Sequence, residues 1–499
     1  MRHLIAYLFL CLVGITTQAH AANNCDVSGI TTTDWLAPDP TSLAEVPNGI
    51  DANNCDFHIY SWRWFTYLLN PLGQTDQRNF EDRAIYPVVD LDTCTSLQTA
   101  AHPVLSHGGV TVGLAKQPDI PDQATGNALY DKNGNIVFYN RSFTANECGI
   151  FANGNFPDAG NANAGFPTGK DQVVELKTSW QILDPSVDNS SYYTQTVALE
   201  GEGDLLLGLI GAHIVVNTAI HPEFVWATFE HVSNAPNCTV NTGTGYTRPQ
   251  PADGWNLVGP TCNACVAKNY ADGTDLRTAC ASACDWNPSN KVQPLPQVDS
   301  NGNTIIKGTP SDICLVEYLG TSSTQSGAQT NIDNIEFLNT LLAGPGGLIA
   351  TQGSTDMNVL QNYFLAGAVW TDMSSFDMSS TDPFNSDMAG SHALANSSME
   401  SFSQPNSNSS SFFDTGCFSC HGGATPQNTA EASHLLTSEP GAAPGLMNRC
   451  NVKADFYDQS GAEAQCPLAC GSASNWNGNW INLVPGSVSA CGCNTCVGN

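Results

Sequence analysis

The chain has 499 residues, with 16 Lys and Arg against 46 Asp and Glu, and its formal net charge is −30. Only 12% of the residues are charged, about half the usual share, so Asn, Ser, Thr and Gly must cover most of the surface. This composition argues against a nucleic-acid-binding protein, which needs a basic face to displace phosphate counterions, and against electrostatic attachment to anionic lipid. The length permits several domains, and the 19 cysteines favour an oxidising compartment.

The N-terminus is typical of a secretory signal peptide. Arg2 and His3 precede an apolar run over residues 4–15, and an Ala-x-Ala pattern follows that ends at Ala21. Because this run is shorter than the ~20 residues that a membrane-spanning helix needs, we expect cleavage after Ala21 rather than an uncleaved anchor. No later stretch is long and apolar enough to span a bilayer. The sequence therefore predicts export to the periplasm or the exterior, without a membrane span.

In chain order, the first strong signal is a helix. Asn54 is a candidate N-cap for a helix over residues 57–69, which is aromatic on all sides and therefore expected to be buried. Runs rich in β-branched and aromatic residues then predict an antiparallel meander. The expected strands cover residues 172–183, 192–199, 204–218 and 223–232.

The pattern changes after this meander. Residues 234–314 form an insertion rich in Cys, Pro and Gly, and a helix is expected at 332–342. Residues 357–370 fit either a helix or a strand. From residue 371 to 413 the chain is polar and rich in Ser, which predicts a flexible linker around a short helix at 391–401.

A motif after this linker has the pattern of covalent c-type haem attachment. It reads Cys417-Phe418-Ser419-Cys420-His421. Two thiols separated by two residues can add to the two vinyl groups of haem, and the adjacent histidine reaches the iron from one side. We interpret Cys417 and Cys420 as the thioether sites and His421 as the proximal iron ligand of one haem c. The alternatives are a C-x-x-C redox pair and half of a zinc site, which would need a second half-site.

The ligand on the other side of the iron would decide the chemistry, and the sequence leaves it open. Methionine or histidine there gives an electron carrier, whereas an open position permits reactions with peroxide or oxygen. The candidates are Met399, Met447 and His434, and Met388 and His392 are also near the motif. The strand region supplies three further histidines: His213, His221 and His231.

The other cysteines are predicted to form disulfides. Of the 19, Cys11 lies in the signal peptide and two lie in the haem motif, so sixteen remain, enough for up to eight bridges. Six lie between residues 238 and 314, and six lie between residues 450 and 496. Six cysteines allow 15 connectivities, so no pair is assigned.

Three motifs follow one another in the C-terminal region. They read AEAQ at 462–465, WNGNW at 476–480 and SVSACGC at 487–493. Their order resembles the repeat of the mannan-binding lectin family first seen in cyanobacteria. The resemblance implies a small disulfide-rich α+β module that binds high-mannose sugar near a W-x-G-x-W turn. The residues that match this family's site are Trp476, Gly478, Asn479 and Trp480.

The residue types in this motif suit a sugar. An exposed Trp offers an apolar face to a sugar ring, and Asn offers a paired donor and acceptor. The alternative is that the two Trp form the core of a small domain held by disulfides. Asn479 stands where the family usually has Gln, and a single copy of the motif predicts weak binding unless several copies act together.

The central chain resembles, less specifically, an uncharacterised group of exported bacterial cytochrome c-like proteins. The matching pieces are WRWFTYLLNP at 62–71, ELKTSWQIL at 175–183, residues 208–236 and LANSSMESF at 394–402. This resemblance implies one domain that runs from about residue 50 into the haem segment, and it names no substrate.

These predictions give an α+β protein with an antiparallel-sheet-rich main domain. The expected parts are a signal peptide (1–21), the main domain (22–370), a linker and haem segment (371–449) and a lectin-like module (450–499). The preferred interpretation is an exported monohaem c-type cytochrome that passes single electrons to an unknown redox partner and is held on glycan. A haem peroxidase or oxidase acting on a lectin-localised substrate is the alternative, so enzyme activity stays open. A carbohydrate-binding protein with a structural haem is the second alternative.

Overall fold

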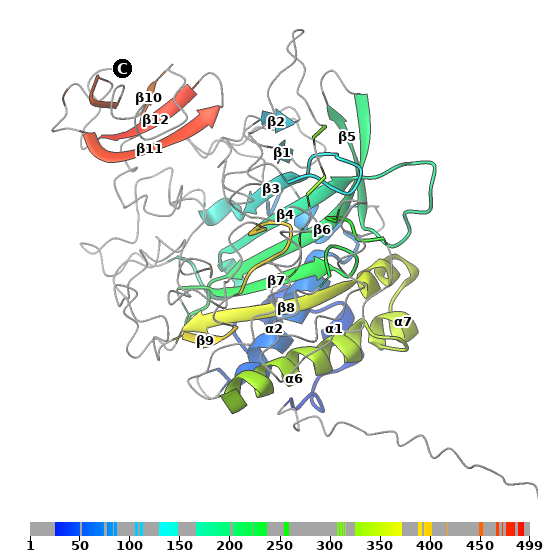
Figure 1. Ribbon diagram of the computed structural model, residues 1–499. Helices are drawn as coiled ribbons and strands as arrows, with labels where there is room; N and C mark the ends of the chain where they lie inside the picture. Colours follow the sequence, from blue (N-terminus) through cyan, green and yellow to red (C-terminus); the bar gives the residue numbers. More distant parts are fainter. Residues whose placement is uncertain are drawn as a thin grey trace, which may run out of the picture.

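The computed structural model describes the main sheet with its helices and parts of the C-terminal region (Figure 1). The predicted signal peptide and most of the Cys-rich insertion lie outside the described residues. The described residues are 25–49, 52–73, 77–82, 84–86, 105–107, 110–112, 129–147, 166–199, 203–221, 223–236, 254–258, 307–308, 310–311, 313, 315, 325–371, 388–391, 394–401, 417, 449–452, 466–468, 472, 476–484 and 488–493.

Within these residues, nine strands form one antiparallel sheet. The strand order is β2-β1-β3-β4-β6-β7-β8-β9, and β5 pairs with the first part of β6, on the edge opposite β4 that β7 occupies further along. Most neighbours in the sheet are also neighbours in the chain, as the predicted meander requires. The strands are β1 (Leu105–His107), β2 (Val110–Val112), β3 (Phe138–Phe143), β4 (Val174–Ile182), β5 (Thr194–Leu199), β6 (Gly203–Val216), β7 (Val225–His231), β8 (Tyr363–Thr371) and β9 (Met388–Gly390).

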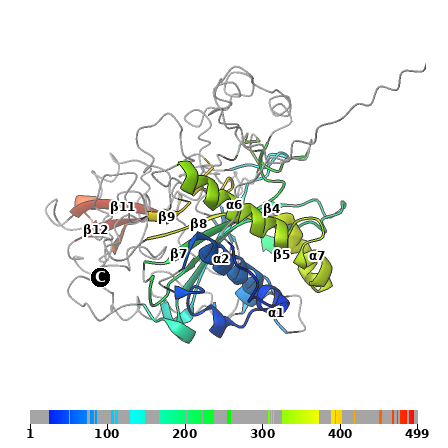
Figure 2. The same ribbon diagram turned by 90° about the horizontal axis from the view of Figure 1, so that it is seen from below.

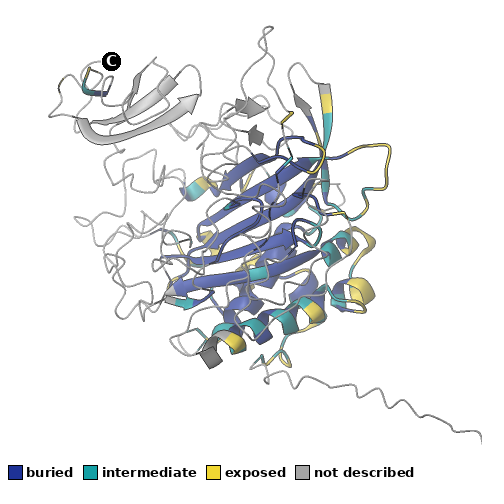
Figure 3. Cartoon of the chain, in the orientation of Figure 1, coloured by how far each residue is buried: buried dark blue, intermediate teal, exposed yellow. Residues whose placement is uncertain are grey.

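Helices cover one face of this sheet (Figure 2). The long helices are α2 (Asn54–Leu68) and α6 (Gln325–Leu342), and the short helices α1 (Thr32–Leu36) and α7 (Leu348–Gln352) lie beside them. Figure 3 shows that the central strands are buried, whereas α6 and α7 each expose one side. Short 3-10 helices are η1 (Pro40–Leu43), η3 (Asn79–Glu81), η4 (Gly169–Asp171) and η5 (Thr355–Asn362).

Helix α2 is the centre of the apolar core. It begins with a capping box, in which Asn53 Oδ1 accepts from Asp56 N at 3.2 Å and Asp56 Oδ2 accepts from Asn53 N at 2.9 Å. Thirteen of its fifteen residues are buried, as the aromatic pattern predicted. Phe65 stacks on Phe229 of β7 with ring centroids 4.0 Å apart, and Phe57 stacks on Trp370 of β8 at 3.8 Å. These contacts fix the helix across β7 and β8.

The structure confirms the α+β class and most of the expected elements. The four strands of the meander are present with ends shifted by a few residues, and the ambiguous stretch 357–370 divides into η5 and β8. The helix expected at 391–401 is wrong, because its described residues form turns. Asn and Ser side chains in this segment bond nearby backbone and side-chain groups, which competes with helix formation.

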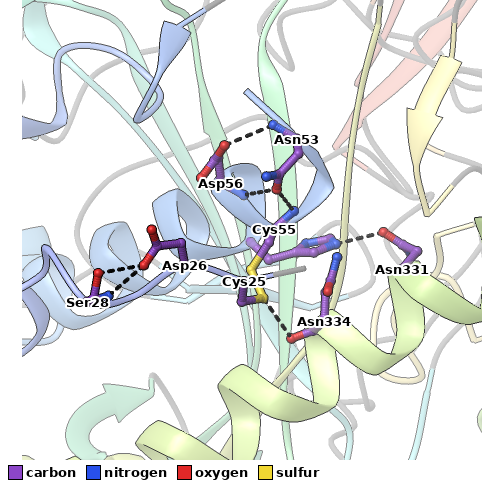
Figure 4. The surroundings of a disulfide bond; sticks show 9 residues. Cys25, Asp26, Ser28, Asn53, Cys55, Asp56, Asn331 and Asn334 are labelled. Carbon is purple, nitrogen blue, oxygen red and sulfur yellow. Dashed lines mark hydrogen bonds between the residues drawn. A yellow bond between two sulfur atoms is a disulfide. The ribbon is translucent and has the colours of Figure 1, made fainter. Parts of the chain in front are cut away.

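One disulfide ties the N-terminal segment to the start of α2 (Figure 4). Cys25 and Cys55 are bonded with their Cα atoms 5.2 Å apart, and Cys25 Sγ lies 4.0 Å from the carbonyl oxygen of Asn334 on α6. Cys466 is also disulfide-bonded. These bonds agree with the prediction that cysteines outside the haem motif form disulfides.

Among the described residues, no helix combines the length and apolar character that crossing a bilayer would need.

Candidate functional site

The sheet face opposite α2 carries a row of polar side chains. Lys177 on β4 lies between Arg141 on β3 and His213 on β6, and Thr228 on β7 continues the row. All four residues are buried. Burying charged and polar groups costs free energy unless each group is paired, so this face needs a polar cover.

Residues 394–401, which we call the polar strap, supply part of that cover. Their sequence is LANSSMES, and every residue except Glu400 is buried. In Figure 1 the strap is the gold segment that crosses the sheet at β4 and β6. It forms neither a helix nor a strand, so its polar groups are held by side-chain hydrogen bonds to the strands beneath it.

Glu400 provides the ionic contacts of the strap. Its two carboxylate oxygens lie 3.0 and 3.1 Å from His213 Nε2, and Oε1 lies 3.5 Å from Lys177 Nζ. Burial would raise the pKa of Glu400, but the charges of His213 and Lys177 outweigh it, helped by hydrogen bonds from His213 and Asn396 N. The net effect lowers the pKa to about 2. Glu400 is therefore ionised at neutral pH.

Asn396 and Ser397 attach the first half of the strap to β7. Asn396 Nδ2 donates to Thr228 Oγ1 at 3.0 Å and to the carbonyl of Phe229 at 3.1 Å. Ser397 N donates to Glu230 Oε1 at 2.8 Å, and the Ser397 hydroxyl donates to the other carboxylate oxygen of Glu230. The buried Glu230 carboxylate thus accepts hydrogen bonds from the strap as well as from Asn234 Nδ2 at 3.3 Å.

Ser398 attaches the strap to β3 and β4. Its Oγ lies 2.6 Å from Ser179 Oγ, and its carbonyl oxygen accepts from Tyr139 OH at 2.8 Å. Gly211 of β6 lies directly below, since a Cβ atom there would meet Ser398 Oγ at 2.5 Å. A Cβ atom at Gly367 of β8 would meet Ser391 Oγ at 2.4 Å and Leu394 Cδ1 at 2.8 Å. Two strand glycines therefore allow the strap to lie close to the sheet.

The His213 imidazole lies between a hydroxyl, that of Thr228, and a carboxylate, that of Glu400. Thr228 Oγ1 lies 2.6 Å from His213 Nδ1, and Glu400 binds the opposite ring nitrogen. The same order of groups activates the nucleophile of hydrolases. Thr228 is fully buried, however, and its oxygen also accepts from Asn396. This arrangement holds the strap and offers no nucleophile to a substrate.

The other two histidines, His221 between β6 and β7 and His231 at the end of β7, also have protein partners. His221 Nδ1 lies 3.0 Å from Glu223 Oε1. His231 stacks on Tyr192 with centroids 4.1 Å apart, and its Nε2 lies 3.1 Å from the carbonyl of Ser191. Burial strips the His231 ring of water and lowers its pKa to about 4, against the smaller effect of the Ser191 bond. These contacts give both imidazole rings a structural role.

The haem motif is described only at its first residue. Cys417 is half-buried, whereas Cys420, His421 and the candidate ligands Met447 and His434 lie outside the described residues. Met399 is described, and it is fully buried in an apolar cluster at the end of the strap. Its neighbours there are Leu129, Val137, Tyr139, Ile210, Ala235, Leu257 and Ile313. This packing favours a structural role for Met399 over iron ligation.

WNGNW and residues 488–493 of the last motif lie on a second sheet, whereas AEAQ lies outside the described residues. In the described part of this region, β10 (Arg449–Val452), β12 (Val488–Cys493) and β11 (Trp476–Val484) pair antiparallel in that order. Trp480 is opposite Cys491, which is opposite Cys450 on the other side. The expected turn at W-x-G-x-W is wrong, because all four predicted contact residues, Trp476, Gly478, Asn479 and Trp480, are part of β11.

The register of β11 is irregular at the motif. Trp476 is opposite Cys493 and Trp480 is opposite Cys491, so the pairing shifts between the two Trp. Gly478 lies at the centre of this shift, as expected for a glycine at a β-bulge. Bulges change the direction of neighbouring side chains and are frequent next to functional sites. The WNGNW motif therefore coincides with an irregular part of β11.

Sequence reasoning missed the polar strap, which it interpreted as a short helix within a flexible linker. The signals that were present are Gly211, inside a predicted strand, and Gly367, inside the stretch 357–370 that fits either a helix or a strand. Glycine within a strand indicates close approach of another segment. The partner residue Glu400 carried no signal of its own.

Comparison with known proteins gives one match. Residues 459–493 match the family model described as mannan-binding protein, and this range contains β11 and β12. The search of curated proteins and the search of solved structures each found no match.

Proposed function

We propose that this protein binds mannose-type glycan through the segment that contains β11 and β12. The observation that carries the proposal is the coincidence of three features: the family match at 459–493, the WNGNW motif and the register shift within that motif. The Trp rings supply apolar faces for the C–H side of a sugar, and the Asn479 amide supplies a donor and an acceptor for paired hydroxyls. With one motif in the chain, affinity rises when several copies of the protein meet one glycan.

Binding of yeast-type mannan to the purified protein tests this proposal. The variants Trp476→Ala, Trp480→Ala and Asn479→Ala should each weaken binding by at least tenfold, as expected for groups that contact the sugar. Leu468→Ala is a matched control, because Leu468 is 75% exposed and lies inside the matched segment but outside the motif. Unchanged binding in all three motif variants would reject this site.

A second function is supported by the C-x-x-C-H motif. We infer that Cys417 and Cys420 hold one haem covalently and that His421 ligates its iron. The donor set fits the group, because two thiols and an imidazole stand at the spacing that thioether attachment needs. When bound, haem supplies a one-electron Fe(III)/Fe(II) couple. Export behind the predicted signal peptide would place the thiols in the compartment where c-type haem attachment takes place. Because this protein is acidic, its redox partner would dock through a basic patch on the partner's own surface.

Haem staining after denaturing electrophoresis tests the covalent link. The wild-type protein, produced with a c-type haem attachment system, should keep its stain, and Cys417→Ala combined with Cys420→Ala should lose it. A cyanide titration then separates the two chemistries. An unreactive low-spin spectrum supports the electron carrier, whereas a reactive high-spin spectrum supports the peroxidase or oxidase. Loss of stain from the wild-type protein would contradict the haem proposal and leave the glycan proposal standing.

A further inference from the structure

The polar strap differs from the other segments of the main sheet in how it is attached. Apolar side chains hold α2 on the sheet, whereas the strap is held mostly by hydrogen bonds between its polar groups and polar groups of the strands. Its apolar residues are Leu394 and Ala395 at the start and Met399, which packs in its own small cluster. When the strap leaves the sheet, water can replace the lost hydrogen bonds of its polar groups. Detaching the strap therefore exposes less apolar surface than detaching α2 would.

Among the described amides of the strap, one donates directly to the sheet, and others donate within the strap or to its flank. Ser397 N donates to Glu230 of β7. Asn396 N donates to Glu400, and Ser398 N donates to Asn396 Oδ1. The side chains of Glu400 and Asn396 are in turn held by His213 and Thr228. The amides of Asn396 and Ser398 are thus linked to the sheet through the side chains that accept from them, whereas Met399 N and Glu400 N donate to the Asn396 carbonyl within the strap.

The strap lies in the chain between the main sheet and the two C-terminal motifs. It is the last described stretch on the main sheet, and the haem motif and the mannan-binding match follow it in the sequence. We propose that the polar strap is a latch that leaves the sheet as one cooperative unit while the sheet stays folded. The latch is then the point at which the chain beyond Ser401 is anchored to the main domain. This proposal depends on neither haem nor sugar.

Hydrogen exchange of the full-length protein, followed by mass spectrometry, tests the latch. Gly211→Ala places a Cβ atom against Ser398 and Ser179, and Gly367→Ala places one against Ser391 and Leu394. Each substitution should speed exchange of the strap amides by at least tenfold, while the β4 and β7 peptides change by less than about twofold. The matched control is Gly208→Ala on the same strand β6, whose Cβ would meet Leu183 and Tyr192 instead of the strap.

Glu400→Gln provides a variant that adds no heavy atom to the structure. It removes the charge that faces His213 and Lys177, and it should also speed exchange in the strap selectively. If the strap and the β7 peptides lose protection together in these variants, the strap is an inseparable part of the core and the proposal is wrong. Unchanged strap exchange in Gly211→Ala, Gly367→Ala and Glu400→Gln would also overturn it.

Discussion

The two faces of the main sheet are buried by opposite chemistry. On the helix side, aromatic rings of α2 stack on β7 and β8, as Phe65 does on Phe229 at 4.0 Å. On the strap side, a carboxylate, an imidazole and hydroxyls are joined by directional bonds, as Glu400 and His213 are at 3.0 Å. Apolar packing depends on the volume that is filled, whereas the polar face depends on each partner being present.

The comparison predicts where each face is sensitive. Removing volume should be costly on the helix side, and removing a single donor should be costly on the strap side. It also predicts a different response to acid, because the buried histidines with lowered pKa, His58 and His231, and the carboxylate with lowered pKa, Glu400, titrate in different ranges.

The largest effect is expected from Phe229→Ala. Phe229 is fully buried between Trp62 and Phe65 of α2, so truncation leaves a cavity that the rings cannot fill. The free energy of unfolding should fall by about 3–5 kcal/mol. Urea unfolding measures the loss, and Phe229→Leu is the control that keeps most of the volume and should cost much less. Similar losses in both variants would show that volume does not govern this face.

Acid should destabilise the helix side first. His58 on α2 is fully buried, which lowers its pKa from 6.5 to about 4 against the opposing bond to Asn331. Because the unfolded chain takes up this proton near pH 6.5 and the folded chain does not, stability is full above that pH and is lost as pH falls towards 4. The loss from this residue should be about 3 kcal/mol.

Urea unfolding at pH 7 and pH 4.5 measures this loss in the wild type and in His58→Gln. The variant should lose clearly less stability between the two pH values. Glu400→Gln is the control from the strap side. Its folded pKa of about 2 lies below the ordinary 4.5, so its contribution is present above pH 4.5 and is lost only as pH falls further. An equal loss of stability in wild type and His58→Gln would show that His58 does not cause the sensitivity to acid.

The smallest effect is expected from Ser397→Ala on the strap side. The substitution removes the hydroxyl that donates to the buried Glu230 carboxylate but leaves the backbone bond at 2.8 Å in place. Stability should fall by about 1–3 kcal/mol. Ser28→Ala is the control, because its hydroxyl bonds Asp26 on the exposed surface and its loss should cost little. Equal costs in the two variants would contradict the dependence of the polar face on each donor.

The helix side could be predicted from the sequence because its signals are local. The aromatic run at 57–69 and the β-branched runs of the meander carry their own periodicity, so α2 and β4 to β7 were found with small errors at their ends. The strap side could not be predicted in the same way. His213 and Glu400 are 187 positions apart in the chain, and nothing local in the sequence near Glu400 names its partner.

The candidate sites show the same limit. The four residues of the sugar motif were identified from their pattern, but a turn was expected where the structure has an irregular strand, because the pairing of β11 with β12 is set by a segment beyond the motif. The haem motif rests on its spacing alone. Of its candidate iron ligands, Met399 looked suitable by its distance along the chain, and only the fold shows that it packs in an apolar cluster.

Chromatography on immobilised mannan, followed by the visible absorption of haem, tests both proposed functions in one experiment. The wild-type protein should be retained and should elute with free mannose-type oligosaccharide, and the haem absorption should elute with the protein. The Trp476→Ala variant should pass through the column with its haem absorption intact. A wild-type protein that appears in the flow-through would contradict glycan binding, and a retained protein without haem absorption would contradict the covalent haem.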